Sequence, residues 1–194
     1  MKFIIGPMPE DEDFEPEKSG WTFLKEPRPS TLFLIALFLA VLSGLETTFL
    51  WVTLTPVKFA RLNPLYALLA VPCIIPLHEL IHALVLPVKQ DRYRTFFGFW
   101  PARFAFYIHY TGPISRTRYM TISIFPYLLL SILPILICAS LQTTSYAVAY
   151  AGIGNSFACG ADFATFLIIL LRVPPNTTLR QQGYKTWWKP RKQP

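Results

Sequence analysis

The chain has 194 residues, of which 53% are hydrophobic and only 15% are charged, and its acidic residues are concentrated in the first thirty positions. Long uncharged central stretches are typical of a multi-pass membrane protein and argue against an ordinary water-soluble globule. The net charge of +7 does not indicate nucleic-acid binding, because the basic residues lie beside apolar segments, where a membrane surface or a topology signal accounts for them.

Residues 1–30 are polar, acidic and proline-containing, which predicts a solvated and mostly irregular tail. The apolar start "MKFII" is too short for a signal peptide, and an acidic run follows it directly. We therefore expect this tail to remain on the protein and to lie outside any membrane.

Four apolar segments follow, at about residues 31–55, 65–87, 119–141 and 146–171. Each is close to the roughly 20 residues that a helix needs to cross about 30 Å of hydrocarbon. A helix is expected because it satisfies its own backbone groups inside lipid. The predicted fold class is an all-α multi-pass membrane protein with about four transmembrane helices.

The stretch between the second and third segments carries a different pattern. In "RTFFGFWPARFAFYIHY", residues Phe104, Phe106, Ile108 and Tyr110 alternate with the intervening side chains, and aromatic residues are enriched. This favours a strand, with "WPAR" as a turn and "TFFGF" as the opposing strand. We expect a short β-hairpin-like insertion here, and the alternative is an irregular interfacial loop.

The C-terminal "GYKTWWKPRKQP" mixes Trp187 and Trp188 with cations, which predicts contact with anionic lipid headgroups rather than nucleic acid. Lysine and arginine cluster in this tail and in residues 88–118, whereas residues 56–64 have two cations and residues 142–145 have none. An even number of spans places both basic regions on one side. By the positive-inside rule, both termini are cytoplasmic.

The second apolar segment contains "CIIPLHELIHALVLP", which holds His78, Glu79 and His82. His78 and His82 are four residues apart, so a helix places both imidazoles on one face, where they can bind one Zn²⁺. Glu79 is positioned to act as a general base on a zinc-activated water. Ionisable residues inside a span are costly and usually functional, so we predict a zinc site; unrelated packing or a lost ancestral site is the alternative.

Catalytic zinc usually has three protein ligands and a water, so a third ligand is needed. Asp162 is favoured, because it and His78 each lie about ten residues from the basic end of their segments, or about 15 Å along a helix. Cys159, one turn away, is the second candidate. His109 would require the hairpin to fold deeply, and Glu46 lies deeper and better suits a proton or water relay.

An apolar helix with "HELIH", a hairpin-like stretch and a later acidic helix together resemble the intramembrane zinc metalloproteases of the site-2 protease type. The closer resemblance, over about residues 65–170, is to the small bacterial membrane proteins labelled putative zincin peptidases. The resemblance implies that His78 and His82 bind zinc, that Glu79 is the base, and that an aspartate on a later span is the third ligand.

The resemblance also implies an edge strand that pairs with an unwound substrate segment, which makes Phe106 and Ile108 candidates for substrate binding. Site-2 proteases carry an Asn-x-x-Pro pattern before Leu-Asp-Gly. Here Asn155 and Asp162 are seven residues apart, one fewer than in that pattern, and the proline is absent. Asn155 is therefore a weaker candidate for positioning the substrate.

The predicted function is an intramembrane zinc metalloprotease that hydrolyses peptide bonds of membrane-associated proteins or peptides, in which zinc polarises the scissile carbonyl and Glu79 transfers the proton. We expect a bacterial inner-membrane protein with an acidic cytoplasmic tail (1–30), a transmembrane metalloprotease-like domain (31–172) and a basic aromatic cytoplasmic tail (173–194). Two alternatives remain: a zinc-dependent membrane enzyme acting on lipid or another non-peptide substrate, and a non-catalytic metal-binding scaffold in which Glu79 is dispensable.

Overall fold

The computed structural model describes residues 1–87, 94–103, 105–143 and 145–191. Four residues of the predicted hairpin or the basic regions lie outside the described ranges: Phe104 of the predicted hairpin, and Lys89, Arg92 and Lys192. The chain divides into two compact units: Met1–Pro27, Glu79–Ser123 and Phe166–Pro194 form the first, and Arg28–His78 and Ile124–Thr165 form the second. Each unit is described separately below.

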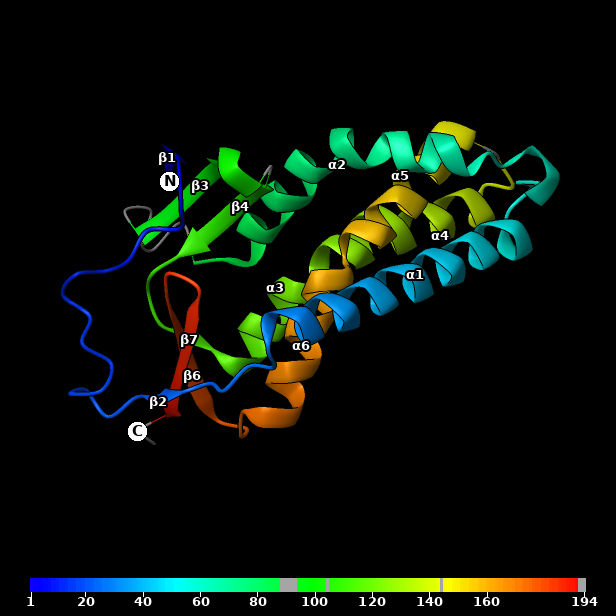
Figure 1. The fold of residues 1–194 in the computed structure, drawn as a ribbon. Helices are drawn as coiled ribbons and strands as arrows, with labels where there is room; N and C mark the ends of the chain where they lie inside the picture. Colours follow the sequence, from blue (N-terminus) through cyan, green and yellow to red (C-terminus); the bar gives the residue numbers. More distant parts are fainter. Residues whose placement is uncertain (88–93, 104, 144, 192–194) are drawn as a thin grey trace. The chain divides into compact units, whose positions relative to one another are not determined.

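The second unit is helical (Figure 1). It contains α1 (Pro29–Leu54), the 3-10 turn η1 (Phe59–Arg61), most of α2 (Pro64–Val85), α4 (Leu133–Ser140), α5 (Tyr146–Ala158) and the first turns of α6 (Gly160–Arg172). α1 packs along α5 and α4. Its apolar core consists of Trp51, Val57, Ala67, Ile135, Cys138, Ala149 and Ile153.

Two glycines allow the helices of the second unit to approach closely. A Cβ atom at Gly160 would overlap the carbonyl oxygen of Ala36 on α1, and one at Gly154 would lie 2.8 Å from the carbonyl oxygen of Ala67 on α2. Small residues permit this type of contact between apolar helices. The close approach holds the segment around Asp162 against its neighbours within the unit.

Within the part of the chain that the structure describes, three helical stretches are long and apolar enough to cross a membrane: Pro29–Leu54, Pro64–Val85 and Arg116–Ser140. A fourth is formed only if α5 and α6 are counted together, and these are bent by 46°. The expectation of one regular helix over residues 146–171 is therefore wrong. α5 ends at its C-cap residue Cys159, whose N–H bonds the carbonyls of Asn155 and Phe157, and Gly160 follows, a residue with low helix propensity.

A π-helical segment, η4 (Leu128–Ile132), separates α3 (Arg116–Tyr127) from α4. Pro134 lies at the start of α4, and proline both lacks a backbone N–H and crowds the carbonyl four residues earlier. This crowding favours the wider turn. Such segments are frequent at functional sites, and this one carries the fully buried Ser131.

The first unit contains a three-stranded sheet with the order β1-β3-β4. β1 (Lys2–Ile5) runs parallel to β3 (Thr95–Trp100), and β3 pairs in antiparallel fashion with β4 (Ala105–Tyr110) across the short turn η3 (Pro101–Arg103). The register places Phe97 opposite Ile108. The predicted hairpin between the second and third apolar segments is thus confirmed, and β4 is the end strand of the described sheet.

A second sheet in the first unit has the order β2-β7-β6-β5. It is formed by β2 (Thr22–Phe23), β7 (Lys185–Pro190), β6 (Thr177–Gln182) and β5 (Ile114–Ser115), and Figure 1 shows the red C-terminal hairpin beside β2. The C-terminal segment therefore forms a strand pair, and its contact with lipid headgroups stays a prediction. Its Trp187 is buried and stacks near Phe23.

The N-terminal segment is mostly irregular between its short strands, as expected, but it is not a fully solvated tail. The apolar start of the chain forms β1, and Phe14 and Leu24 are buried. Asp11 accepts an ion-pair hydrogen bond from Arg180, and its backbone exchanges hydrogen bonds with the Gln182 side chain. The side chains that bond Asp11 lie more than 160 residues further along the chain. Sequence composition does not reveal such contacts. The ranges 1–30, 31–172 and 173–194 stay predictions as functional domains.

Candidate metal centre

The three residues of the HELIH motif lie on one continuous helix, α2, which runs through both Pro72 and Pro76. Consecutive turns place His78 and His82 on one face, and one ligand atom from each of His78, Glu79 and His82 lies within 4.8 Å of the others. Both histidines are buried. Two buried imidazoles on successive turns are a usual donor pair for zinc.

Within the second unit, both ring nitrogens of His78 face polar side chains. Nδ1 lies 2.9 Å from Oδ1 of Asn155, and Nε2 lies 2.9 Å from Oδ2 of Asp162. The amide of Asn155 donates from Nδ2 to the Pro126 carbonyl at 3.2 Å and to the Ser131 hydroxyl at 2.9 Å. A carbonyl can only accept, so Oδ1 of Asn155 must be the atom that faces His78. It accepts a hydrogen bond, and Nδ1 of His78 therefore carries the proton.

The nature of the contact between His78 and Asp162 depends on this tautomer. A neutral His78 protonated at Nδ1 presents the Nε2 lone pair to a carboxylate oxygen, so two acceptors face each other at 2.9 Å. Such a pair requires a cation between them, either a proton or a metal. Two ligand atoms of one tetrahedral zinc lie about 3.3 Å apart at ordinary bond lengths. The donor types therefore suit zinc, and the separation of 2.9 Å is that of a hydrogen bond from a protonated imidazole.

Asp162 is also placed where an anion is favoured. It lies in the first turn of α6, and the partial positive charge at a helix N-terminus stabilises a carboxylate there. Its side chain is about one-fifth exposed, whereas His78 is nearly inaccessible.

Cys159 belongs to the same group, because one donor atom each from His78, Cys159 and Asp162 lies within 4.8 Å of the others. Its sulfur is 3.9 Å from Nδ1 of His78 and 3.6 Å from the amide nitrogen of Asn155. The sulfur thus lies beside the protonated nitrogen of the imidazole, whereas Asp162 lies beside the nitrogen that carries the lone pair. Between the two candidates from the sequence, Asp162 has the better position.

In the first unit, His82 has a matching arrangement. Its Nδ1 lies 2.8 Å from the backbone carbonyl oxygen of Ile122, which can only accept, so Nδ1 carries the proton. Both histidines of the motif thus have Nδ1–H directed at an acceptor, and Nε2 is the ring atom that would coordinate a metal. Metal-binding histidines almost always use their second nitrogen in this way, because the bond fixes the tautomer and the ring orientation.

Glu79 contacts the edge of the hairpin in the first unit. Its Oε2 accepts a hydrogen bond of 3.0 Å from the backbone N–H of Ile108 on β4. That N–H therefore points away from β3. Since backbone groups alternate along a strand, the edge-facing residues of β4 are Phe106, Ile108 and Tyr110. The two residues that the sequence suggested for substrate binding, Phe106 and Ile108, present their backbone groups on this edge.

The other two ligand candidates occupy different surroundings. Glu46 on α1 interacts with the hydroxyl of Tyr127. His109 on β4 is almost fully buried, and this burial lowers its pKa to about 4, an effect that the backbone of Pro9 partly opposes. Neither residue belongs to a group of possible metal ligands among the described residues.

A chain of buried hydroxyl groups supports Asn155, and sequence reasoning missed it. Thr47 on α1 bonds Ser156 at 2.7 Å, Ser156 donates to Ser131 at 3.0 Å, and Ser131 donates to the Gly152 carbonyl at 2.8 Å. These hydroxyl residues and Asn155 are fully buried. The signal in the sequence was the presence of small polar residues inside apolar segments, including Ser43 and Thr47 four residues apart.

Asn155 was a weak candidate for positioning the substrate. In this structure it has no exposed surface, and its amide bonds His78, Pro126 and Ser131. These contacts connect the imidazole of His78 to the core of the second unit. The amide therefore orients the histidine.

A family profile described as "putative zincin peptidase" matches residues 71–178, which is more than half of the chain. The matched range contains His78, Glu79, His82 and Asp162, together with the β3–β4 hairpin. No curated protein and no solved structure was found to match the chain.

Proposed function

Because the chain belongs to the putative zincin peptidase family, which implies a metallopeptidase, we propose that it is an intramembrane zinc metalloprotease. The observation that carries the proposal is the contact between the Nε2 lone pair of His78 and the carboxylate of Asp162. Two acceptors in this arrangement are a metal site more naturally than a structural contact. Hydrolysis of peptide bonds in membrane-associated proteins is the proposed reaction.

We assign His78, His82 and Asp162 as the zinc ligands, with the fourth position left to water, as in other catalytic zinc sites. Zinc bound there supplies Lewis acidity to the scissile carbonyl and to the attacking water. Asn155 and the Ile122 carbonyl hold the two imidazoles in the required tautomers. They are positioning groups and do not contact the substrate.

Glu79 is proposed as the general base. It takes a proton from the attacking water as the new carbon–oxygen bond forms, and it delivers this proton to the amine nitrogen as the carbon–nitrogen bond breaks. Its carboxylate is held by the Ile108 N–H, which places the base at the edge of β4. Water is consumed, and no other reactant is needed.

We propose that the substrate binds as an extended segment beside β4. Extended peptides add to exposed sheet edges through backbone hydrogen bonds. The edge-facing groups of Phe106 and the carbonyl of Ile108 suit this mode, whereas the Ile108 N–H holds Glu79. A helical substrate segment would have to unwind first, since its backbone groups are otherwise paired within the helix. The requirement favours substrates that contain a locally weak helix.

The protein is proposed to lie in the bilayer with both termini in the cytoplasm, supported by three to four sufficiently apolar helices and by the positions of the basic residues. A cysteine introduced at the exposed Lys185 tests the orientation in a chain lacking Cys73, Cys138 and Cys159. It should resist a membrane-impermeant thiol reagent in intact cells. Labelling from outside would overturn the orientation.

The test of the activity uses Glu79→Gln, whose carboxamide is nearly isosteric but cannot accept the proton. The variant should retain zinc and lose hydrolysis. When the membrane proteomes of cells carrying the variant and the wild type are compared, intact substrate should be more abundant with the variant. Cleavage of a validated substrate at the wild-type rate would make the mechanism wrong. Changes confined to the membrane lipids would instead indicate a lipid-directed enzyme.

A further inference from the structure

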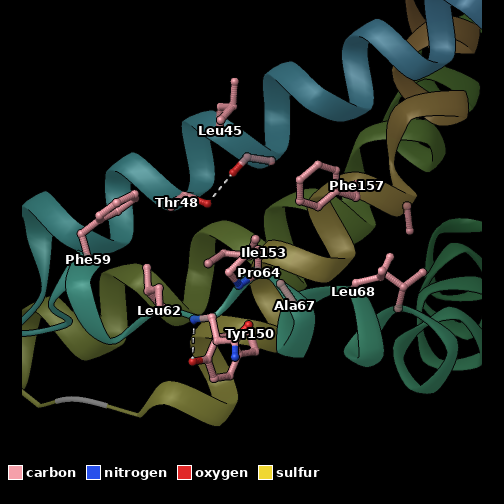
Figure 2. A pocket seen from close by; sticks show the side chains of 14 residues that line it. Leu45, Thr48, Phe59, Leu62, Pro64, Ala67, Leu68, Tyr150, Ile153 and Phe157 are labelled. Carbon is pink, nitrogen blue, oxygen red and sulfur yellow. Dashed lines mark hydrogen bonds between the residues drawn. The ribbon is translucent and has the colours of Figure 1, made fainter.

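The second unit contains a cavity of about 610 Å³ that the proposed reaction does not use. Figure 2 shows its lining side chains, which come from α1, the segment before α2, the first half of α2, and α5. The walls are almost entirely apolar. They include Leu45, Leu62, Leu68, Val71, Ile153 and Phe157.

The depth of the cavity matches one leaflet of a bilayer. It begins beside Phe59 and Leu62, just after the end of α1, and reaches Phe157 at its other end (Figure 2). The lining residue Gly44 lies against the ring of Phe157. Gly44 is ten residues from Leu54, the last residue of α1, which corresponds to about 15 Å of helical rise. Half of a hydrocarbon core of about 30 Å is the same length.

The mouth of the cavity carries unbalanced positive charge. Lys58 and Arg61, both exposed, flank the lining residue Phe59 in a segment, residues 55–63, that has no acidic residue. This segment is held in place from α5: the Tyr146 hydroxyl accepts from the Lys58 N–H at 3.3 Å, and the Tyr150 hydroxyl donates to the Arg61 carbonyl at 3.2 Å. The two cations thus extend from an ordered rim.

We propose that this cavity is a specific site for an anionic phospholipid, with one acyl chain along the apolar walls and the headgroup phosphate bound by Lys58 and Arg61. Lysine and arginine are the usual partners of phosphate, and the volume lies in the range of ligand pockets.

The inference rests on the proposed placement in a membrane and is independent of peptidase activity. It is therefore tested on the full chain carrying Glu79→Gln, in nanodiscs that contain phosphatidylglycerol or phosphatidylcholine. A trace of the same lipid carries a photoactivatable acyl chain. Adducts are quantified and mapped by mass spectrometry, and the zinc content of each sample is measured in parallel.

The expected result is a phosphatidylglycerol adduct on the cavity residues, with little adduct from phosphatidylcholine. Val71→Trp fills the cavity and should remove most of this adduct, whereas Leu37→Trp, on an exposed part of α1 outside the lining, should not. Leu68→Trp, at a strongly exposed lining residue, serves as a second filling variant if Val71→Trp does not fold.

The role of the two cations is tested with the double variant Lys58→Gln and Arg61→Gln. This variant should weaken labelling by phosphatidylglycerol about tenfold or more, as expected for loss of charge-assisted hydrogen bonds. Labelling by phosphatidylglycerol should then equal labelling by phosphatidylcholine. Arg28→Gln, at the other end of α1, is the matched control. Equal labelling by the two wild-type lipids, or labelling that survives both filling variants, would overturn the proposal while leaving the zinc result unaffected.

Discussion

Replacing Asn155 by leucine should weaken zinc binding without unfolding the second unit. Leucine keeps the branched shape of asparagine but removes the acceptor for Nδ1–H of His78, which lies 2.9 Å away in a fully buried position. A buried donor without a partner costs about 1–3 kcal/mol. The imidazole can avoid this cost by rotating or by moving its proton to Nε2, and either change removes the lone pair directed at Asp162.

The size of the effect follows from this cost. At about 1.4 kcal/mol per tenfold change, 1–3 kcal/mol corresponds to roughly a 5- to 150-fold loss of affinity, in agreement with the 10- to 100-fold typical of groups that orient metal-binding histidines. We therefore expect Asn155→Leu to bind zinc about 10- to 100-fold more weakly. Competition against a chelating indicator dye, with purified protein in detergent, measures this directly.

Two companion variants separate orientation from general stability. Ser43→Ala removes a buried hydroxyl that bonds the Ser156 carbonyl at 2.8 Å but does not touch His78, so it should lower the melting temperature and leave zinc affinity unchanged. Asn155→Asp keeps an acceptor for Nδ1–H and should restore most of the affinity, although it loses the donor to Ser131. Wild-type affinity in a folded Asn155→Leu protein would refute the assigned tautomer.

Three further predictions concern other parts of the chain. Asp162→Ala should lower zinc occupancy sharply and Asp162→Asn by an intermediate amount, whereas Cys159→Ser should leave it nearly intact; metal analysis showing the reverse order would transfer the ligand role to the cysteine. Ile108→Pro removes the N–H that donates a hydrogen bond to Glu79 and disturbs the edge of β4. Turnover of a validated substrate should therefore fall while zinc is retained, and unchanged turnover would exclude substrate pairing at this edge. His109 has a pKa of about 4 in the fold against a usual 6.5: the unfolded chain takes up the proton first, so stability should fall by up to about 1.4 kcal/mol per pH unit below pH 6.5 until about pH 4. Thermal melts of His109→Phe should lose this slope, and a slope equal to that of the wild type would assign it to another group.

The sequence was sufficient for the elements with a strong local pattern. Apolar length predicted the helical segments, and period-two alternation with aromatic residues predicted β4. The spacing of His78 and His82 predicted a shared helix face because helix geometry is local. The preference for Asp162 over Cys159 came from counting residues to the basic ends of two helices, and the contact with Nε2 of His78 supports it.

The remainder depends on contacts between distant residues. The N-terminal segment was expected to be a solvated tail, but Leu24 is buried and Asp11 bonds Arg180 and Gln182. At the bend after Cys159, Gly160 packs closely against the Ala36 carbonyl of α1. The support of Asn155 by Ser131 comes from a π-helical segment, and a hydrophobicity pattern does not predict either feature.

The most direct test of the central claim is the zinc content of the purified wild-type chain beside that of His78→Ala, measured after equilibration with zinc and removal of loosely bound metal. The wild type should hold one zinc per chain, and His78→Ala should hold almost none, because it loses the donor directed at Asp162 while the rest of the helix is unchanged. A folded wild-type protein without zinc, or equal zinc in both proteins, would contradict the assignment of a metal centre to this motif.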